Sequence, residues 1–268
     1  MKGERRSSKR GTSLEFADFR NYTPGDDLRR LDWNVYARLD RPFLKLFEEE
    51  EDLAVHILVD TSQSMDWGEG EQNKFHYALN LAAALGTIAL ASGDQVTIAG
   101  FQAGNPSTLF GPVRGQQNTM RMLKFLESLA PGGRTDLQRS LRDYALEARR
   151  PGLAFLISDL FSSSDYQAGF TQVRSRGYQV NLIHVLSPDE LDPPLAGDLR
   201  LLDVETGQAQ EVSLDGGMRD LYRERLKFWR AEIQADCRKR GIRFLGLSTA
   251  QAWDQVVLQE MRRAGVVK

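Results

Sequence analysis

The pattern of apolar and polar positions predicts a regular succession of strands and helices that begins near residue 53. Residues 54–59 form a short, continuous apolar run rich in β-branched side chains, which is typical of a strand buried on both faces. The run ends abruptly in small polar residues, so this strand delivers oxygen-bearing side chains at its carboxyl end. Because strand and helix patterns continue to alternate, the sequence indicates an α/β fold with a mostly parallel sheet covered on both faces.

The other predicted elements follow from short apolar runs and from apolar residues that recur at helical spacing. Further strands are expected at residues 95–101, 107–110, 153–158, 178–186 and 242–247. Helices are expected at residues 73–91, 120–126, 137–148, 167–176, 218–240 and 252–263. The helix at 73–91 should bury a face made of Phe75, Leu79, Ala82, Leu85 and Ala89. Residues 199–213 depart from the alternation and predict a β-hairpin insertion.

The first fifty residues have a different character. Residues 1–13 are basic and rich in Ser and Gly, which predicts a flexible arm. Residues 14–50 are dense in aromatic side chains, namely Phe16, Phe19, Tyr22, Trp33, Tyr36, Phe43 and Phe47. Within them, Leu28, Leu31, Val35 and Leu39 predict one amphipathic helix, and residues 43–48 should be extended. Because so much aromatic surface favours burial, we expect residues 14–50 to pack on the main domain, residues 51–268.

Composition excludes several classes of protein. The 268 residues are 41% hydrophobic and 27% charged, with a net charge of −2, which indicates a globular chain and argues against a dedicated nucleic-acid binder. The single cysteine, Cys237, excludes an internal disulfide and a cysteine-built zinc site. No apolar run is long enough to span a bilayer, and no signal-peptide core follows the basic N-terminus. We therefore expect a cytoplasmic chain without stable membrane insertion, whose basic tail is solvated.

Polar oxygens gather at three predicted strand ends. Asp60, Ser62 and Ser64 alternate along the loop after the first strand, Thr135 lies in a glycine-containing loop, and Asp159 ends another buried strand. In an open parallel sheet, ligands bind beyond the carboxyl ends of the strands, so these side chains should lie on one side of the sheet. Hydroxyl and carboxylate oxygens are hard ligands that suit Mg²⁺ or Mn²⁺. The simpler alternative is a strand followed by a polar turn.

These residues carry a resemblance to a known site. Asp60-x-Ser62-x-Ser64, with Thr135 and Asp159 later in the chain, resembles the metal-ion-dependent adhesion site of von Willebrand factor A domains. The resemblance covers residues 53–250 and implies a doubly wound, Rossmann-like sheet extended by the N-terminal segment and the hairpin. It also implies that Ser62, Ser64 and Thr135 contact the metal directly, whereas Asp60 and Asp159 act mainly through water.

A second resemblance concerns the N-terminal segment. Residues 15–27 (EFADFRNYTPGDD), Arg30-Leu31-Asp32-Trp33 and Ala37-Arg38 resemble the signature of the domain-of-unknown-function 58 family. Many members of that family carry N-terminal transmembrane segments, and this chain resembles the short kind without them. The family is associated with MoxR-type AAA+ ATPases, and its members are thought to act as binding or assembly factors. A MoxR-type ATPase is therefore the partner that the resemblance implies.

Three functional classes can be weighed against one another. The first is a non-enzymatic module in which a bound metal recruits an acidic side chain from a protein partner. The second is a phosphohydrolase of haloacid-dehalogenase type with Asp60 as nucleophile, but that chemistry wants a second acid where this chain has Ser62. The third is a structural domain whose metal site has lost its function.

A serine hydrolase is disfavoured because His56 and His184 lie in predicted strands and no Gly-x-Ser-x-Gly elbow exists. A nucleotide site is disfavoured because residues 131–136 lack the Gly-Lys-Ser/Thr ending.

The N-terminal signature also contains a dense set of charges of both signs. Its members are Asp26, Asp27, Arg29, Arg30, Asp32 and Arg38. They can form a salt-bridged surface that fastens the segment to the main domain, or they can form a second docking face for a partner. Both interpretations remain open at the level of the sequence.

Overall fold

The computed structural model describes residues 15–48, 53–101, 108–147, 150–162, 165–194, 197–202, 209–214 and 216–260. The chain divides into two compact units, Met1–Asp52 and Leu53–Lys268, and each is described by itself. The flexible arm predicted for residues 1–13 lies outside the described residues. The packing of residues 14–50 on the main domain stays a prediction.

The first unit is a two-stranded sheet that carries a short helix. Strand β1 (Glu15–Asn21), which the sequence did not predict, pairs in antiparallel fashion with β2 (Phe43–Glu48), which it did. The single helix predicted from Leu28 onward is wrong: a 3₁₀ turn (Leu28–Arg30) is separated from α1 (Trp33–Leu39). The break occurs because Leu31 forms a β-bridge with Leu44, and because the Asp32 side chain caps α1.

The charges of the signature are partly used inside this unit. The Asp26 carboxylate pairs with Arg20 at 2.8 Å and accepts hydrogen bonds from Thr23. These contacts lower the pKa of Asp26 to about 2. Asp32 pairs with Lys45 at 3.0 Å in addition to capping α1. Both ion pairs join residues of the first unit, so fastening to the main domain and docking of a partner both stay predictions.

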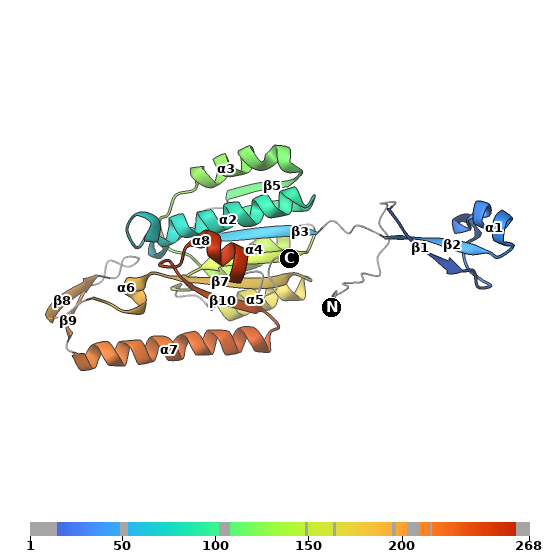
Figure 1. Ribbon diagram of the computed structural model, residues 1–268. Coiled ribbons are helices and arrows are strands. Elements are labelled where there is room, and N and C mark those ends of the chain that lie inside the picture. The colour runs from blue at the N-terminus through green and yellow to red at the C-terminus, as the bar shows by residue number, and fades with distance from the viewer. Residues whose placement is uncertain are drawn as a thin grey trace. The chain divides into compact units, whose positions relative to one another are not determined.

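The second unit is built on a six-stranded sheet, as Figure 1 shows. Its strands, in spatial order, are β10 (Arg243–Ser248), β7 (Gln179–Leu186), β6 (Leu153–Ser158), β3 (Ala54–Asp60), β4 (Gln95–Phe101) and β5 (Thr108–Arg114). All neighbours are parallel except β5, which runs antiparallel to β4. The predicted α/β class and mostly parallel sheet are confirmed.

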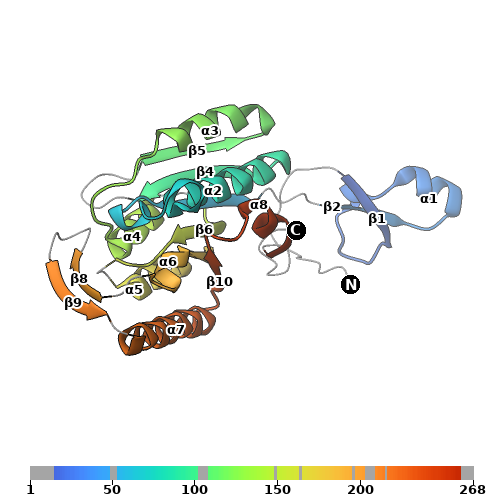
Figure 2. The same cartoon turned by 60° about the vertical axis from the view of Figure 1, so that its left-hand side comes forward.

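Helices cover both faces of this sheet (Figures 1 and 2). One face packs on α2 (Lys74–Ala91) and α3 (Thr119–Ser128), and the core there includes Ile57 of β3 and Leu81 of α2. The other face packs on α4 (Leu137–Glu147), α5 (Tyr166–Ser175) and α7 (Gly216–Lys239), and its core includes Leu58, Leu141 and Ile233. Successive residues of β3 thus point into opposite cores, as strand geometry requires. The first core also holds Val256 and Val257, which follow α8 (Trp253–Gln255) in the π-helical turn Val256–Glu260.

Two smaller elements follow β7. Helix α6 (Pro188–Leu191), which was not predicted, begins at a capping box formed by Ser187 and Glu190. The hairpin of β8 (Gly197–Leu202) and β9 (Ala209–Leu214) confirms the predicted insertion. Among the described residues, no helix combines the length and the apolar character needed to cross a membrane.

The buried face of α2 is wider than the predicted one. Phe75, Ala82, Leu85 and Ala89 are buried as predicted. Leu79 is only partly buried, whereas Lys74, Ala78 and Leu81 are completely enclosed. The prediction missed these three enclosed residues because the helix is apolar on nearly all sides, so its buried stripe is broad and poorly defined by periodicity. The correction brings a lysine into the core.

Candidate metal site

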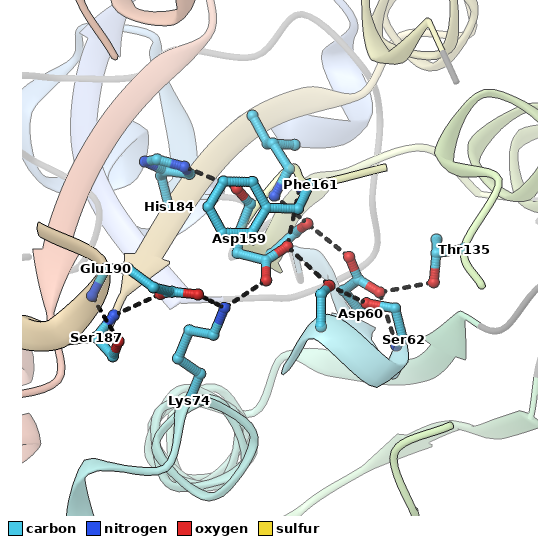
Figure 3. A network of polar contacts seen from close by, with 12 residues as sticks. Asp60, Ser62, Lys74, Thr135, Asp159, Phe161, His184, Ser187 and Glu190 are labelled. Atoms are coloured by element: carbon cyan, nitrogen blue, oxygen red, sulfur yellow. Dashed lines mark hydrogen bonds and ion pairs between the residues drawn. The ribbon is translucent and has the colours of Figure 1, made fainter. Parts of the chain in front are cut away.

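The five predicted oxygen donors converge at the carboxyl ends of the strands, as Figure 3 shows for most of them. Asp60 is the last residue of β3, and Asp159 follows the last residue of the neighbouring β6. The chain runs from β3 outward to β4 and β5 on one side, and through β6, β7 and β10 on the other. The site therefore lies at the point where the strand order reverses, which is where open α/β sheets bind their ligands.

Asp60 is fully enclosed and hydrogen-bonded through both oxygens. Its Oδ1 accepts from the Ser62 N–H at 3.0 Å and from the Thr135 hydroxyl at 2.8 Å. Its Oδ2 accepts from the Ser158 hydroxyl at 2.6 Å. All three donors are neutral. The Asp60 carboxylate thus orders the surrounding loops, and no cationic side chain of the described residues forms an ion pair with it.

The serine hydroxyls lie beside this carboxylate. Ser62 Oγ and Ser64 Oγ are 3.0 Å apart, and Ser64 Oγ lies 3.4 Å from Asp159 Oδ1. Their loop is joined to the loop of Thr135 by two backbone hydrogen bonds, Gln63 N–H to Gly133 O and Gly132 N–H to Thr61 O, both 2.9 Å long. These bonds hold the hydroxyls of two distant segments in fixed positions relative to each other.

The backbone after Asp159 has an uncommon conformation. Leu160 has φ 58°, the left-handed region that costs a non-glycine residue on the order of 1 kcal/mol or more. This turn lets the Phe161 N–H donate to Asp159 Oδ1 at 3.0 Å and the Leu160 N–H donate to Ser158 Oγ at 2.9 Å. The turn therefore aims both Ser158 and Asp159 at the site.

Two charged residues of the site were missed at the level of the sequence. Lys74 Nζ lies 2.6 Å from Asp159 Oδ2 and 2.5 Å from Glu190 Oε1, and the Lys74 side chain is fully buried (Figure 3). A signal for Lys74 exists, since it stands four residues before Ala78 and seven before Leu81, on the buried stripe of α2. The sequence around Glu190 shows only a capping-box pattern with Ser187, and this pattern does not predict a contact with Lys74.

Two carboxylates of the site have raised pKa values. Burial and the neighbouring charge of Asp159 raise the pKa of Asp60, although its hydrogen bonds oppose this shift. Burial also raises the pKa of Glu190, against the lowering effect of Lys74. Burial is the larger cause for both groups, because it disfavours the ionised form of a carboxylate. A cation close to both Asp60 and Asp159 would offset the repulsion between these two carboxylates.

The chemistry of the donors indicates which cation fits. Among the described residues, no group of three or more His, Cys, Asp or Glu side chains is arranged to hold a metal. Three hydroxyls, with two carboxylates behind them, form an all-oxygen set, and such sets favour Mg²⁺ or Mn²⁺ over zinc. Ser62, Ser64 and Thr135 are the residues that would hold such an ion.

The two strand histidines have different surroundings. His56 is satisfied, since its ring nitrogens contact the Tyr144 hydroxyl at 2.7 Å and the Arg150 carbonyl at 3.0 Å. His184 Nε2 donates to the Asp159 carbonyl at 2.9 Å, while its Nδ1 has no partner. Burial lowers the pKa of each to about 4. Both histidines lie in strands, as predicted, and His56 has partners at both ring nitrogens whereas His184 has one.

Comparisons with known proteins agree with this architecture. Residues 18–232 match the family model described as "Protein of unknown function DUF58". The chain is 31% identical over 263 residues to the uncharacterized protein Rv1480 of Mycobacterium tuberculosis, an alignment that covers 96% of this chain and 82% of that protein. It is 29% identical over 154 residues to the uncharacterized protein MAV169 of Mycobacterium avium, covering 57% of this chain and 90% of that protein.

Two solved structures of other proteins were compared with the fold of this chain. An aerotolerance-related membrane protein from Bacteroides fragilis matches with a TM-score of 0.50 and 18% identity, covering 79% of this chain and 99% of that one. The VWA domain of SpRpn10 matches with a TM-score of 0.44 and 12% identity, covering 77% of this chain and 94% of that one. Such likenesses concern the fold alone. From its family match, its relatives and its sheet, the chain belongs to the DUF58 family, with a von Willebrand factor A-like fold in its second unit.

Proposed function

We propose that this protein is a metal-dependent protein–protein interaction module in which Mg²⁺ or Mn²⁺ binds at Ser62, Ser64 and Thr135. The observation that carries the proposal is the arrangement of these hydroxyls in front of the buried carboxylates of Asp60 and Asp159. When bound between neutral hydroxyls, such an ion keeps much of its charge and attracts a carboxylate. An aspartate or glutamate of a partner protein would supply that carboxylate.

The environment of Asp60 favours binding over catalysis. A nucleophilic aspartate needs an oxygen that can reach the substrate, but Asp60 is only 1% exposed and both of its oxygens accept hydrogen bonds from within the protein. We therefore propose a non-enzymatic role, with phosphohydrolase chemistry at Asp60 as the alternative to be tested.

Exposed aromatic side chains support a protein partner. Trp67, in the loop after β3, is 49% exposed, and Phe161, in the loop after β6, is 38% exposed. Phe161 also stacks on Trp229 with ring centroids 5.5 Å apart, so its ring is held in place. Aromatic residues are enriched where protein surfaces meet, and rigid ones lose little entropy on binding.

The partner to test first is a MoxR-type AAA+ ATPase, on the strength of the family resemblance. The purified ATPase would be captured on immobilised protein in Mg²⁺ and again in EDTA. Capture should require the metal and should be lost in Thr135→Ala. Thr135→Ser, which keeps the hydroxyl, is the matched control and should retain capture.

Two results would overturn parts of this proposal. Capture that is unchanged in EDTA would exclude the bound metal as the recognition element. Metal-dependent hydrolysis of phosphate esters that disappears in Asp60→Asn would place the protein among the enzymes.

A further inference from the structure

Lys74 is a buried cation with two anionic partners. It is the first residue of α2, and its Nζ contacts Asp159 Oδ2 at 2.6 Å and Glu190 Oε1 at 2.5 Å. The exposed fractions of the three side chains are 0% for Lys74, 0% for Asp159 and 14% for Glu190. The ring of Phe161 covers the ammonium at 5.0 Å. A charge enclosed in this way is tolerated only when it is closely paired.

Both partners of Lys74 are held in place by other contacts. The remaining oxygen of Asp159, Oδ1, accepts from the Phe161 N–H and faces the Ser64 hydroxyl. Glu190 Oε2 accepts from the Ser187 N–H at 2.8 Å, and the Glu190 carbonyl accepts from the Tyr222 hydroxyl at 2.7 Å. Lys74 is thus part of a cluster of charged side chains that other contacts hold in place. Figure 3 shows the consecutive ion pairs from Glu190 to Lys74 and from Lys74 to Asp159.

The charges of this cluster do not balance on their own. Asp60, Asp159 and Glu190 bring three negative charges when ionised, and Lys74 brings one positive charge. One divalent cation at the hydroxyls would complete the balance. Removing Lys74 would increase the negative charge that such a cation meets, whereas removing the charge of Glu190 would decrease it.

We propose that Lys74 and Glu190 are an opposed pair of affinity-setting residues, in which Lys74 weakens divalent-cation binding at the Ser62–Ser64–Thr135 site and Glu190 strengthens it. This inference rests on the proposed metal site and adds two residues that regulate it. The physical basis is Coulomb's law: unit charges a few ångströms apart in a partly buried site interact by enough to change an affinity about tenfold or more. Lys74 also keeps Asp159 Oδ2 occupied, which leaves only Oδ1 on the side of the hydroxyls.

The test is a titration of the 268-residue chain with Mn²⁺ at neutral pH, in which electron paramagnetic resonance measures the free Mn²⁺. Lys74→Met should bind Mn²⁺ about tenfold more tightly than the unaltered chain, and Glu190→Gln about tenfold more weakly. The double variant removes one charge of each sign, so its affinity should return to within about threefold of the unaltered chain. Lys124→Met, at an exposed lysine of α3, is the control for net charge and should change the affinity by less than about twofold.

The outcomes separate this inference from the function on which it rests. If the unaltered chain binds no Mn²⁺, the metal site itself is wrong. If it binds Mn²⁺ but Lys74→Met and Glu190→Gln shift the affinity in the same direction, the two residues have only a structural role. Should Lys74→Met fail to fold by circular dichroism, tighter binding by the double variant than by Glu190→Gln still supports the proposal, and equal or weaker binding overturns it.

Discussion

The Ser158 hydroxyl donates a hydrogen bond of 2.6 Å to Asp60 Oδ2 and so joins the end of β6 to the end of β3. Ser158 Oγ also accepts from the Leu160 N–H at 2.9 Å, and Ser158 is completely buried. One side chain thus connects the two strands between which the order of the sheet reverses, and it also fixes the turn that follows.

This relationship predicts the effect of Ser158→Ala. The variant leaves Asp60 Oδ2 and the Leu160 N–H without partners in the interior, so the free energy of unfolding should fall by about 2–4 kcal/mol. Chemical denaturation measures this change. Ser128→Ala, at an exposed serine of α3, is the control and should cost less than about 0.5 kcal/mol. Equal losses in the two variants would mean that Ser158 does not hold the strand ends together.

Metal binding should stabilise the fold. At 100 times the dissociation constant, a ligand that binds only the native state adds about 2.7 kcal/mol, which for a chain of this size raises the Tm by roughly 5–10 °C. Asp60→Ala should abolish the rise produced by Mg²⁺ or Mn²⁺. Asp143→Ala, at an exposed aspartate of α4, should retain it. If Asp60→Ala still shows the full rise in a thermal melt, the cation binds elsewhere.

The loop that leads from Ser64 to Lys74 depends on a glycine. Gly68 has φ 94°, and a Cβ atom there would lie 2.5 Å from the Gln72 carbonyl oxygen. Gly68→Ala should therefore lower the free energy of unfolding by more than about 2 kcal/mol, since backbone must move. Gly93 has a similar φ of 81°, but a Cβ atom there would meet no other atom within 4 Å, so Gly93→Ala should cost only about 1 kcal/mol. If denaturation shows that Gly68→Ala and Gly93→Ala lose similar amounts of unfolding free energy, the clash with Gln72 does not explain the effect at Gly68.

Acid should weaken the fold through His56. Burial lowers the pKa of its imidazole from 6.5 to about 4, so in acid the unfolded chain binds a proton that the native protein excludes. The stability that neutral His56 contributes is therefore full above about pH 6.5 and declines as the pH falls toward about 4. Between pH 6.5 and pH 5 the loss should reach about 2 kcal/mol, at about 1.36 kcal/mol for each pH unit.

Denaturation curves at several pH values check this prediction. His184 has a pKa lowered to about 4 as well and contributes a similar slope, so His56→Gln should remove about half of the dependence of unfolding free energy on pH in this range. His76→Gln, at an exposed histidine of α2, should leave the dependence as it is. An unchanged slope in His56→Gln would show that other groups cause the loss.

Residues 14–50 should be needed by the rest of the chain. Leu28, Trp33 and Leu39 are 55%, 63% and 60% exposed, and burying apolar surface is worth roughly 25 cal/mol per Å². If these side chains pack on the second unit, a fragment of residues 51–268 exposes the complementary apolar surface and should aggregate. Size-exclusion chromatography and thermal melts of the fragment test this. A monomeric fragment that unfolds cooperatively would contradict the prediction.

The sequence by itself determined the strands of the second unit and the oxygen donors at their ends. Strands β4 and β6 lie at the residues predicted for them, and Asp60, Ser62, Ser64, Thr135 and Asp159 do meet. Both results come from local patterns: a buried strand needs an uninterrupted apolar run, and parallel strands deliver their next residues to one edge of the sheet.

Only the tertiary structure decided which residues surround those donors. Glu190 is 116 residues from Lys74, and their contact requires that the end of β7 and the start of α2 meet at the same corner of the sheet. In the first unit, the pairing of Leu31 with Leu44 interrupts a helix that local spacing favours. In both cases the deciding contact joins residues far apart in the chain or in different elements, and a pattern read along one segment contains no information about the partner that the other segment provides.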